Sequence, residues 1–171
     1  YSGNIGKGHN VKLLVSIAER MKQDDEIQFV IIGEGWEKKI IQDLIEKKSL
    51  NNVLLLPYQP SNRLSYSLSA ADLAYISVED NVSTICVPSK TFNFIKLGTP
   101  LLCIAQEDAE IAKLIRAHEI GGVFRQTEID NIVDFIFRLK NDKKKREKYK
   151  NNLAQAKSIF SPENSFKFIK D

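Results

Sequence analysis

Short, continuous apolar runs alternate with amphipathic segments of helical period along the chain. The runs that predict strands are 27–32, 53–56, 73–78, 101–105 and 121–124. Such runs are typical of parallel strands covered on both faces, and their alternation with helices predicts an α/β domain with right-handed crossovers. Tyr1 and Ser2 look like the end of a further strand. We therefore predict a doubly wound, mostly parallel, Rossmann-like sheet of about six strands, followed by C-terminal helical segments over 129–159.

The composition is that of an ordinary globular domain. The 171 residues are 43% hydrophobic and 27% charged, with a formal net charge of +3, a profile that excludes a disordered or fibrous chain. The basic run 143–148 is interpreted as the solvated face of a helix, and it lacks the interleaved aromatic residues of a nucleic-acid-binding surface. We predict one domain over 1–171, either alone or as half of a larger protein, with no nucleic acid as partner.

The cysteines and the hydropathy of the sequence indicate in which cellular compartment the protein is found. Cys86 and Cys103 lie in apolar surroundings, which predicts small buried side chains in a reducing compartment and neither a disulfide framework nor a metal site. No apolar run approaches the roughly 20 residues of a membrane-spanning helix, and no signal peptide is recognisable. These features predict a cytoplasmic domain.

One helix has a sharply marked start and stop. Pro88 suits the first turn of a helix, Gly98 suits the residue that ends one, and Pro100 forbids its continuation. Phe92, Ile95 and, one turn on, Thr99 fall on one face of this helix, with Phe94 and Leu97 beside it. We predict that this face packs against the sheet.

Ser89, Lys90 and Thr91 occupy the amino-terminal turn of that helix. The helix dipole and the free amides attract an anion, the two hydroxyls can donate hydrogen bonds, and the lysine adds a full positive charge. The hydroxyls can equally cap the free amides themselves. This turn is therefore a candidate phosphate site, and an ordinary capped helix with a solvated lysine is the alternative.

A glycine-rich turn near the start of the chain is a second candidate anion site. Gly3, Gly6 and Gly8 directly precede a segment of helical period that runs from Val11 to Met21. The spacing of the three glycines differs from the dinucleotide fingerprint G-x-G-x-x-G. The turn thus favours an anion-binding loop of another kind.

Two further loops follow predicted strands, at the edge where ligands of open α/β sheets bind. Gly33-Glu34-Gly35 ends the run 27–32, and Tyr58 lies between two prolines after the run 53–56. The glycines can contact a ligand or form a tight strand-to-helix turn. Tyr58 can stack on a base or pack against the protein.

Five short motifs, in order, resemble those of the donor-binding, C-terminal half of GT-B glycosyltransferases of the family 4 type, also called glycosyl transferases group 1. They are Gly3-Asn4-Ile5-Gly6, Val30-Ile31-Ile32-Gly33-Glu34-Gly35, Ala71-Asp72-Leu73, Pro88-Ser89-Lys90 with Gly98-Thr99-Pro100, and Phe160-Ser161-Pro162-Glu163. The resemblance covers nearly the whole chain. The fourth motif is the most specific, and it resembles enzymes that act on UDP-linked N-acetylated or deoxy sugars in bacterial surface polysaccharide synthesis.

The resemblance implies transfer of a sugar from a nucleotide diphosphate donor, UDP-linked here, with retention of anomeric configuration and with no cofactor or obligatory metal. It also implies that 1–171 is the donor half of a two-domain enzyme, inactive without the N-terminal half that binds a polysaccharide or lipid-linked acceptor. The full-length protein is then expected in the cytoplasm, peripheral at the inner face of the membrane.

Roles for individual residues follow from the same resemblance. The family holds the diphosphate with helix amides and a basic residue, and the corresponding residues here are Ser89, Lys90 and Thr91, with Lys7 as a second cation and Gly6 beside it. The residues expected at the ribose and the sugar are Asn93, Asn4, Gly33, Glu34 and Gly35, and Tyr58 is expected at the base. No residue is assigned as catalytic.

Two departures from the family pattern keep other functions open. The family's pair of glutamates falls on Ile85 and Asn93, and its arginine near the first turn is replaced by Asn4. One alternative is a degenerate nucleotide-binding module with a regulatory or assembly role. Another is a GT-B-type sugar-nucleotide epimerase, for which His9 is the histidine near the donor. A generic Rossmann domain is the structural alternative, and the missing fingerprint counts against it.

Overall fold

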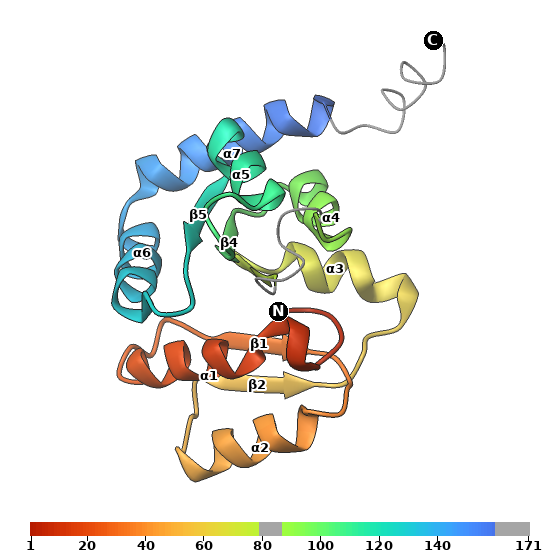
Figure 1. Cartoon of the computed structure of the whole chain (residues 1–171), viewed down its shortest axis with the longest axis vertical. Helices are drawn as coiled ribbons and strands as arrows, with labels where there is room; N and C mark the ends of the chain where they lie inside the picture. Colours follow the sequence, from red (N-terminus) through yellow and green to blue (C-terminus); the bar gives the residue numbers. More distant parts are fainter. Residues whose placement is uncertain (79–86, 160–171) are drawn as a thin grey trace.

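A computed structural model of the chain describes residues 1–78 and 87–159, and it has the predicted α/β architecture (Figure 1). Its strands are β1 (Phe29–Ile32), β2 (Val53–Leu56), β3 (Ala74–Ser77), β4 (Leu101–Ile104) and β5 (Gly121–Phe124). They form two parallel sheets, one of order β1-β2 and one of order β3-β4-β5. The predicted strand end at Tyr1 and Ser2 is confirmed, because Ser2 forms a parallel bridge with Ile32.

Seven α-helices accompany these strands in the described ranges. They are α1 (Val11–Arg20), α2 (Lys38–Lys47), α3 (Leu64–Ser69), α4 (Lys90–Leu97), α5 (Glu110–His118), α6 (Ile129–Asn141) and α7 (Lys143–Ile159), with short 3-10 turns at η1 (Lys7–His9) and η2 (Ser61–Arg63). The predicted positions of Ile85, Cys86 and the motif 160–163 lie outside the described residues.

The predicted helical segment 129–159 is divided at Asp142. This residue has extended dihedral angles, φ −104° and ψ 95°, which end α6. Its carboxylate Oδ1 accepts a hydrogen bond of 2.9 Å from the backbone N–H of Lys145, three residues further on. Asp142 therefore caps the N-terminus of α7 and fixes the start of a second helix.

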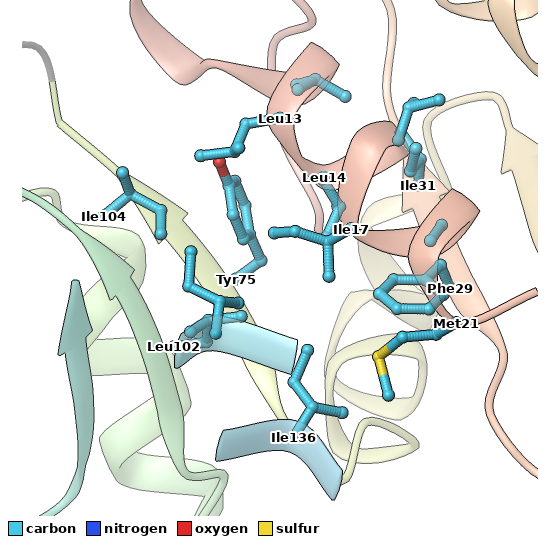
Figure 2. Close-up of a cluster of buried hydrophobic side chains, with 14 of the residues drawn as sticks. Leu13, Leu14, Ile17, Met21, Phe29, Ile31, Tyr75, Leu102, Ile104 and Ile136 are labelled. Carbon is cyan, nitrogen blue, oxygen red and sulfur yellow. The ribbon is translucent and has the colours of Figure 1, made fainter. Parts of the chain in front are cut away.

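Side chains of the three-stranded sheet point alternately to two cores. Tyr75, Leu102 and Ile104 face a cluster that includes Leu14 of α1 and Phe29 of β1 (Figure 2). A second cluster lies on the opposite face, formed by Ala74, Ile76, Leu101 and Cys103 with side chains of α4, α5 and α7. Because both faces of this sheet are covered, its strands read as continuous apolar runs, as predicted.

Helix α4 starts and stops where the sequence predicts, and burial of Ile95 and Thr99 confirms part of its predicted packing face. The prediction is wrong for Phe92, which is 38% exposed, because the buried residues of the helix are Thr91, Phe94 and Ile95. The threonine methyl group and the two larger side chains complete an i, i+3, i+4 stripe. Gly98 closes the helix in the left-handed conformation, φ 76° and ψ 25°, as predicted.

No helix in residues 1–78 and 87–159 is both long enough and apolar enough to cross a membrane.

Candidate functional site

The two glycine turns predicted as separate candidates lie against each other. The backbone N–H of Gly3 donates to the carbonyl of Ile32 at 2.9 Å, and the N–H of Ile5 donates to the carbonyl of Glu34 at 2.7 Å. The N–H of Glu37 in turn donates to the carbonyl of Ile5 at 3.1 Å. The turn after Ser2 and the turn after β1 therefore form one layer at the carboxyl edge of the sheet.

Glycine is required at both positions of the second turn by close backbone approach. A Cβ atom on Gly33 would lie 1.9 Å from the carbonyl oxygen of Gly3, and one on Gly35 would lie 2.3 Å from the carbonyl oxygen of Ile5. These separations are far below van der Waals contact. Gly33 and Gly35 thus bring the two turns together, and their predicted contact with the sugar or ribose stays a prediction.

Lys90 projects from the first turn of α4 onto this layer. Its Nζ lies 4.6 Å from the centroid of the Tyr1 ring, and it lies 2.6 Å from the point that a Cβ of Gly3 would occupy. Partial burial lowers the pKa of the Lys90 ammonium below its usual range. Within residues 1–78 and 87–159 no carboxylate pairs with this ammonium, which lies against the face of the Tyr1 ring beside the glycine turn.

Tyr1 is the residue that holds Lys90 in place, and the sequence did not indicate it as a site residue. Its hydroxyl donates a 2.5 Å hydrogen bond to the carbonyl of Asn4, and its ring meets that of Tyr75 edge-on at 6.2 Å. Burial raises the pKa of the Tyr1 phenol, and the nearby Tyr58 raises it further. The loop that carries Tyr58 is therefore adjacent to the same layer, and the Tyr58 side chain is itself exposed.

A second cation and a tryptophan lie beside the first turn. The Nζ of Lys7 is 5.1 Å from the centroid of the Trp36 ring, and Trp36 is 65% exposed. Gly6 lies close to the same tryptophan, because a Cβ there would be 3.2 Å from Nδ2 of Asn4 and 3.4 Å from Nε1 of Trp36. Trp36 is not among the site residues predicted from the sequence, and it lies two residues before α2 begins at Lys38.

The acidic residues near the turns are paired with lysines. Glu34 pairs with Lys38 at 2.7 Å across one helical turn. Glu37 is almost fully buried and pairs with Lys12 at 2.7 Å, which ties α1 to the start of α2. Within residues 1–78 and 87–159, the carboxylates of Glu34 and Glu37 are thus paired with lysines other than Lys90 and Lys7.

The remaining residues of α4 divide between surface and interior. Ser89 and Asn93 are exposed, and Asn93 lies one turn after Lys90 on the same side of the helix. Thr91 is 0% exposed, and its hydroxyl has no hydrogen-bond partner among the described residues. Neither hydroxyl caps the helix, so the alternative of an ordinary side-chain cap is not realised. The buried hydroxyl of Thr91 lies apart from Ser89, and its predicted role at a diphosphate stays a prediction.

His9, the histidine of the epimerase alternative, lies near Tyr1. The rings of His9 and Tyr1 are 6.1 Å apart, with the Tyr1 ring between η1 and β3. The structure thus brings Gly3, Gly33 and Lys90 together, with Tyr1 beside Lys90 and Trp36 beside Lys7.

Parallel strands that end in two interlocked glycine turns, with the N-terminus of α4 beside them, give this chain a Rossmann-like α/β fold of the kind found in GT-B glycosyltransferases. More particularly, the chain belongs to the family of glycosyl transferases group 1, whose family model matches residues 1–156.

Similar proteins come from bacterial surface polysaccharide synthesis. The chain is 25% identical over 114 residues to WcaI of Escherichia coli K12, named as a colanic acid biosynthesis glycosyl transferase, and the match covers 67% of this chain and 28% of that protein. A structure of a TarM mutant from S. aureus in a complex that includes UDP superposes with a TM-score of 0.78 at 20% identity, covering 98% of this chain and 33% of that one. The chain therefore spans less than a third of the length of the curated relatives it matches.

A solved C-terminal domain has nearly the same extent. It belongs to LpcC, a glycosyl transferase group 1 family protein from Francisella tularensis, and superposes with a TM-score of 0.70 at 17% identity. The superposition covers 93% of this chain and 84% of that domain.

Proposed function

We propose that this chain is the donor-binding half of a retaining glycosyltransferase that holds a UDP-linked sugar at the glycine turns and the N-terminus of α4. The observation that carries the proposal is the partly buried ammonium of Lys90, which meets no carboxylate in the described residues and rests against Gly3. A departing UDP gains negative charge, and a fixed cation in a partly dehydrated place stabilises that charge. The fold shared with TarM, whose structure contains UDP, supports uracil as the base.

The proposed contacts follow from where the side chains lie. Lys90, the exposed Ser89 and the free amides of α4 are assigned to the diphosphate, and Lys7 is a second cation at the other turn. These two lysines replace the charge that a metal ion would supply, so the proposal includes no metal. Asn93 and the backbone of 33–35 are assigned to the ribose and sugar, and the exposed Tyr58 to the base.

The acceptor belongs to the remainder of the protein. Because the matched relatives are more than three times as long as their matched parts, we assign acceptor binding to an N-terminal domain and expect the isolated donor half to be inactive. The relation to WcaI favours a polysaccharide or lipid-linked acceptor, which would bring the full-length enzyme to the inner face of the membrane.

Isothermal titration of the chain with UDP, GDP, ADP and NAD at matched salt tests the nucleotide. We expect UDP to bind with a dissociation constant of about 1 mM or tighter, and the other three to bind at least tenfold more weakly. The same titration of the full-length protein is the control, because the binding cleft could require both domains and the isolated chain would then bind too weakly. The proposal would be contradicted if the chain bound NAD more tightly than UDP, or if the full-length protein bound none of the four nucleotides.

A degenerate nucleotide-binding module is the second candidate, because Asn93 and Ile85 stand where the family has glutamates. Such a module would bind UDP without transferring sugar. Incubation of the full-length protein with UDP-sugars and a lipid-linked acceptor, followed by NMR of the product, separates the two functions. A product with the anomeric configuration of the donor supports the retaining enzyme, and absence of turnover with retained UDP binding supports the module.

Replacing Thr91 with valine is expected to leave UDP binding within about twofold of the original, because the hydroxyl is enclosed by the protein. The melting temperature is expected to stay the same or rise, since the change removes a buried hydroxyl that lacks a partner and keeps the side-chain shape. Titration calorimetry and thermal unfolding measure the two effects. A tenfold loss of UDP affinity with unchanged stability would show that the Thr91 hydroxyl contacts the diphosphate after all.

A further inference from the structure

The single tryptophan of the chain, Trp36, lies at the glycine turns with most of its ring in solvent. It directly follows Gly35, and it is 65% exposed. Tryptophan is a residue that folded proteins bury strongly on average, so this degree of exposure is unusual. The ring stands at the edge of the candidate site, where it is available to stack on a bound molecule.

The backbone that carries Trp36 is fixed on both sides. The N–H of Glu37 donates to the carbonyl of Ile5 at 3.1 Å, and the N–H of Lys38 donates to the carbonyl of Gly35 at 3.0 Å. The side chain of Glu37 is itself buried. A ligand would therefore meet a ring whose backbone position is already set, which reduces the entropy lost on binding.

Polar groups lie beside this ring. The Nζ of Lys7 is 5.1 Å from the centroid of the Trp36 ring. Nδ2 of the exposed Asn4 and Nε1 of Trp36 lie 3.2 Å and 3.4 Å from the same point, the position of a Cβ on Gly6. An apolar ring face with an ammonium and an amide near it suits a pyranose ring. The C–H groups of such a sugar meet the negative face of the indole, and its hydroxyls meet the polar groups.

Lys7 connects this ring to the diphosphate of the donor, to which it is assigned above. Its contact with the indole is a cation–π interaction between two exposed side chains, which is weaker than a charge-assisted hydrogen bond to a phosphate. A bound diphosphate would therefore draw the ammonium off the ring and free the indole face. The donor sugar is joined to the same diphosphate, so it would lie within reach of that face.

We propose that Trp36 is a specificity-determining residue that stacks on the pyranose ring of the donor sugar, with Asn4 at the edge of that ring and Lys7 on the diphosphate. The proposal rests on the proposed function, because the diphosphate positions the sugar. The contact is made by the aromatic face and not by a hydrogen bond. Phenylalanine at position 36 therefore keeps most of the contact, and alanine removes it.

Titration calorimetry with UDP, UDP-glucose, UDP-galactose and UDP-N-acetylglucosamine tests the proposal, on the chain and on the full-length protein. The sugar ratio is defined as the dissociation constant of UDP divided by that of the UDP-sugar that the original protein binds most tightly. We expect Trp36→Ala to lower the sugar ratio about three- to tenfold while UDP itself binds within about twofold of the original. Trp36→Phe should keep the sugar ratio within about twofold.

Phe137→Ala is the matched control for loss of an exposed aromatic ring. Phe137 is 54% exposed on α6, which lies at the opposite side of the molecule from the loop between β1 and α2 (Figure 1). Its replacement should leave the sugar ratio unchanged. Because Trp36 and Phe137 are both exposed, all three variants should melt close to the temperature of the original, which thermal unfolding verifies.

An unchanged sugar ratio in the folded Trp36→Ala variant would overturn the proposal. So would an equal loss of affinity for UDP and the UDP-sugar, which would assign the ring to the base or the diphosphate. If the sugar ratio is unchanged and only the KM for the acceptor rises in the full-length protein, the ring belongs to an acceptor sugar instead. Absence of UDP binding by the original full-length protein would contradict the proposed function and this proposal together, whereas normal UDP binding with an unchanged sugar ratio contradicts this proposal alone.

Discussion

Replacing Gly33 with alanine is expected to destabilise the fold by about 3 kcal/mol or more, because the added Cβ has no room. It would lie 1.9 Å from the carbonyl oxygen of Gly3, so the two turns must separate and the hydrogen bonds of Gly3 and Ile5 to the second turn are strained or lost. At about 2–4 °C per kcal/mol for a domain of this size, thermal unfolding should show a melting temperature lower by about 6–12 °C.

The same substitution at Gly98 is the matched control. Gly98 has a positive φ of 76°, but nothing lies within 4 Å of the position of its Cβ. Alanine there incurs only the conformational cost of the left-handed region, about 1–2 kcal/mol. Equal destabilisation by the two variants would show that backbone conformation, and not the approach of the two turns, is what requires glycine at Gly33.

Replacing Lys90 with alanine is expected to weaken UDP binding about 10- to 100-fold while leaving uridine binding unchanged. The estimate follows from about 1.5–3 kcal/mol for a hydrogen bond to a charged group. Partial burial lowers the pKa of Lys90, which shows that the folded protein disfavours its charged form. The variant should therefore fold at least as stably as the original, and titration calorimetry with UDP and uridine compares the two ligands.

Lys96 is the control for charge on the same helix. It is exposed in the last turn of α4, away from the glycine turns. Its replacement by alanine should change UDP affinity by less than about twofold, since an exposed charge at this distance is screened by salt. Equal losses for UDP and uridine in the Lys90 variant would contradict the diphosphate assignment.

The strands were predictable because burial on both faces makes each of them an uninterrupted apolar run. The buried faces of the helices were less predictable, because the hydrophobicity of a residue does not by itself determine whether it is buried or exposed. Phe92 and Ile40 are exposed although both are large and apolar, whereas Thr91 is buried. Asp142 carried a capping signal that could have divided the last helical segment.

The candidate site was predictable in its parts but not in its assembly. Glycine turns and a helix start are local signals, and the strand order that brings them together is not. Tyr1 and Trp36 were not predicted as site residues, because their roles depend on contacts with residues distant in sequence. Tyr1 contacts Lys90, and Trp36 contacts Lys7 on the other glycine turn. An aromatic residue directly before or after a glycine turn at a strand end is the signal that could have marked both.

Trp36 is the single tryptophan of the chain, and it stands beside the candidate site with most of its indole ring in solvent. Its environment in the folded protein therefore differs little from that in the unfolded chain, whereas a molecule bound near Lys7 would change it directly. The intrinsic fluorescence of Trp36 is therefore expected to report occupancy of the site rather than folding. The domain thus carries its own optical probe, so an equilibrium titration needs neither a dye nor a labelled ligand.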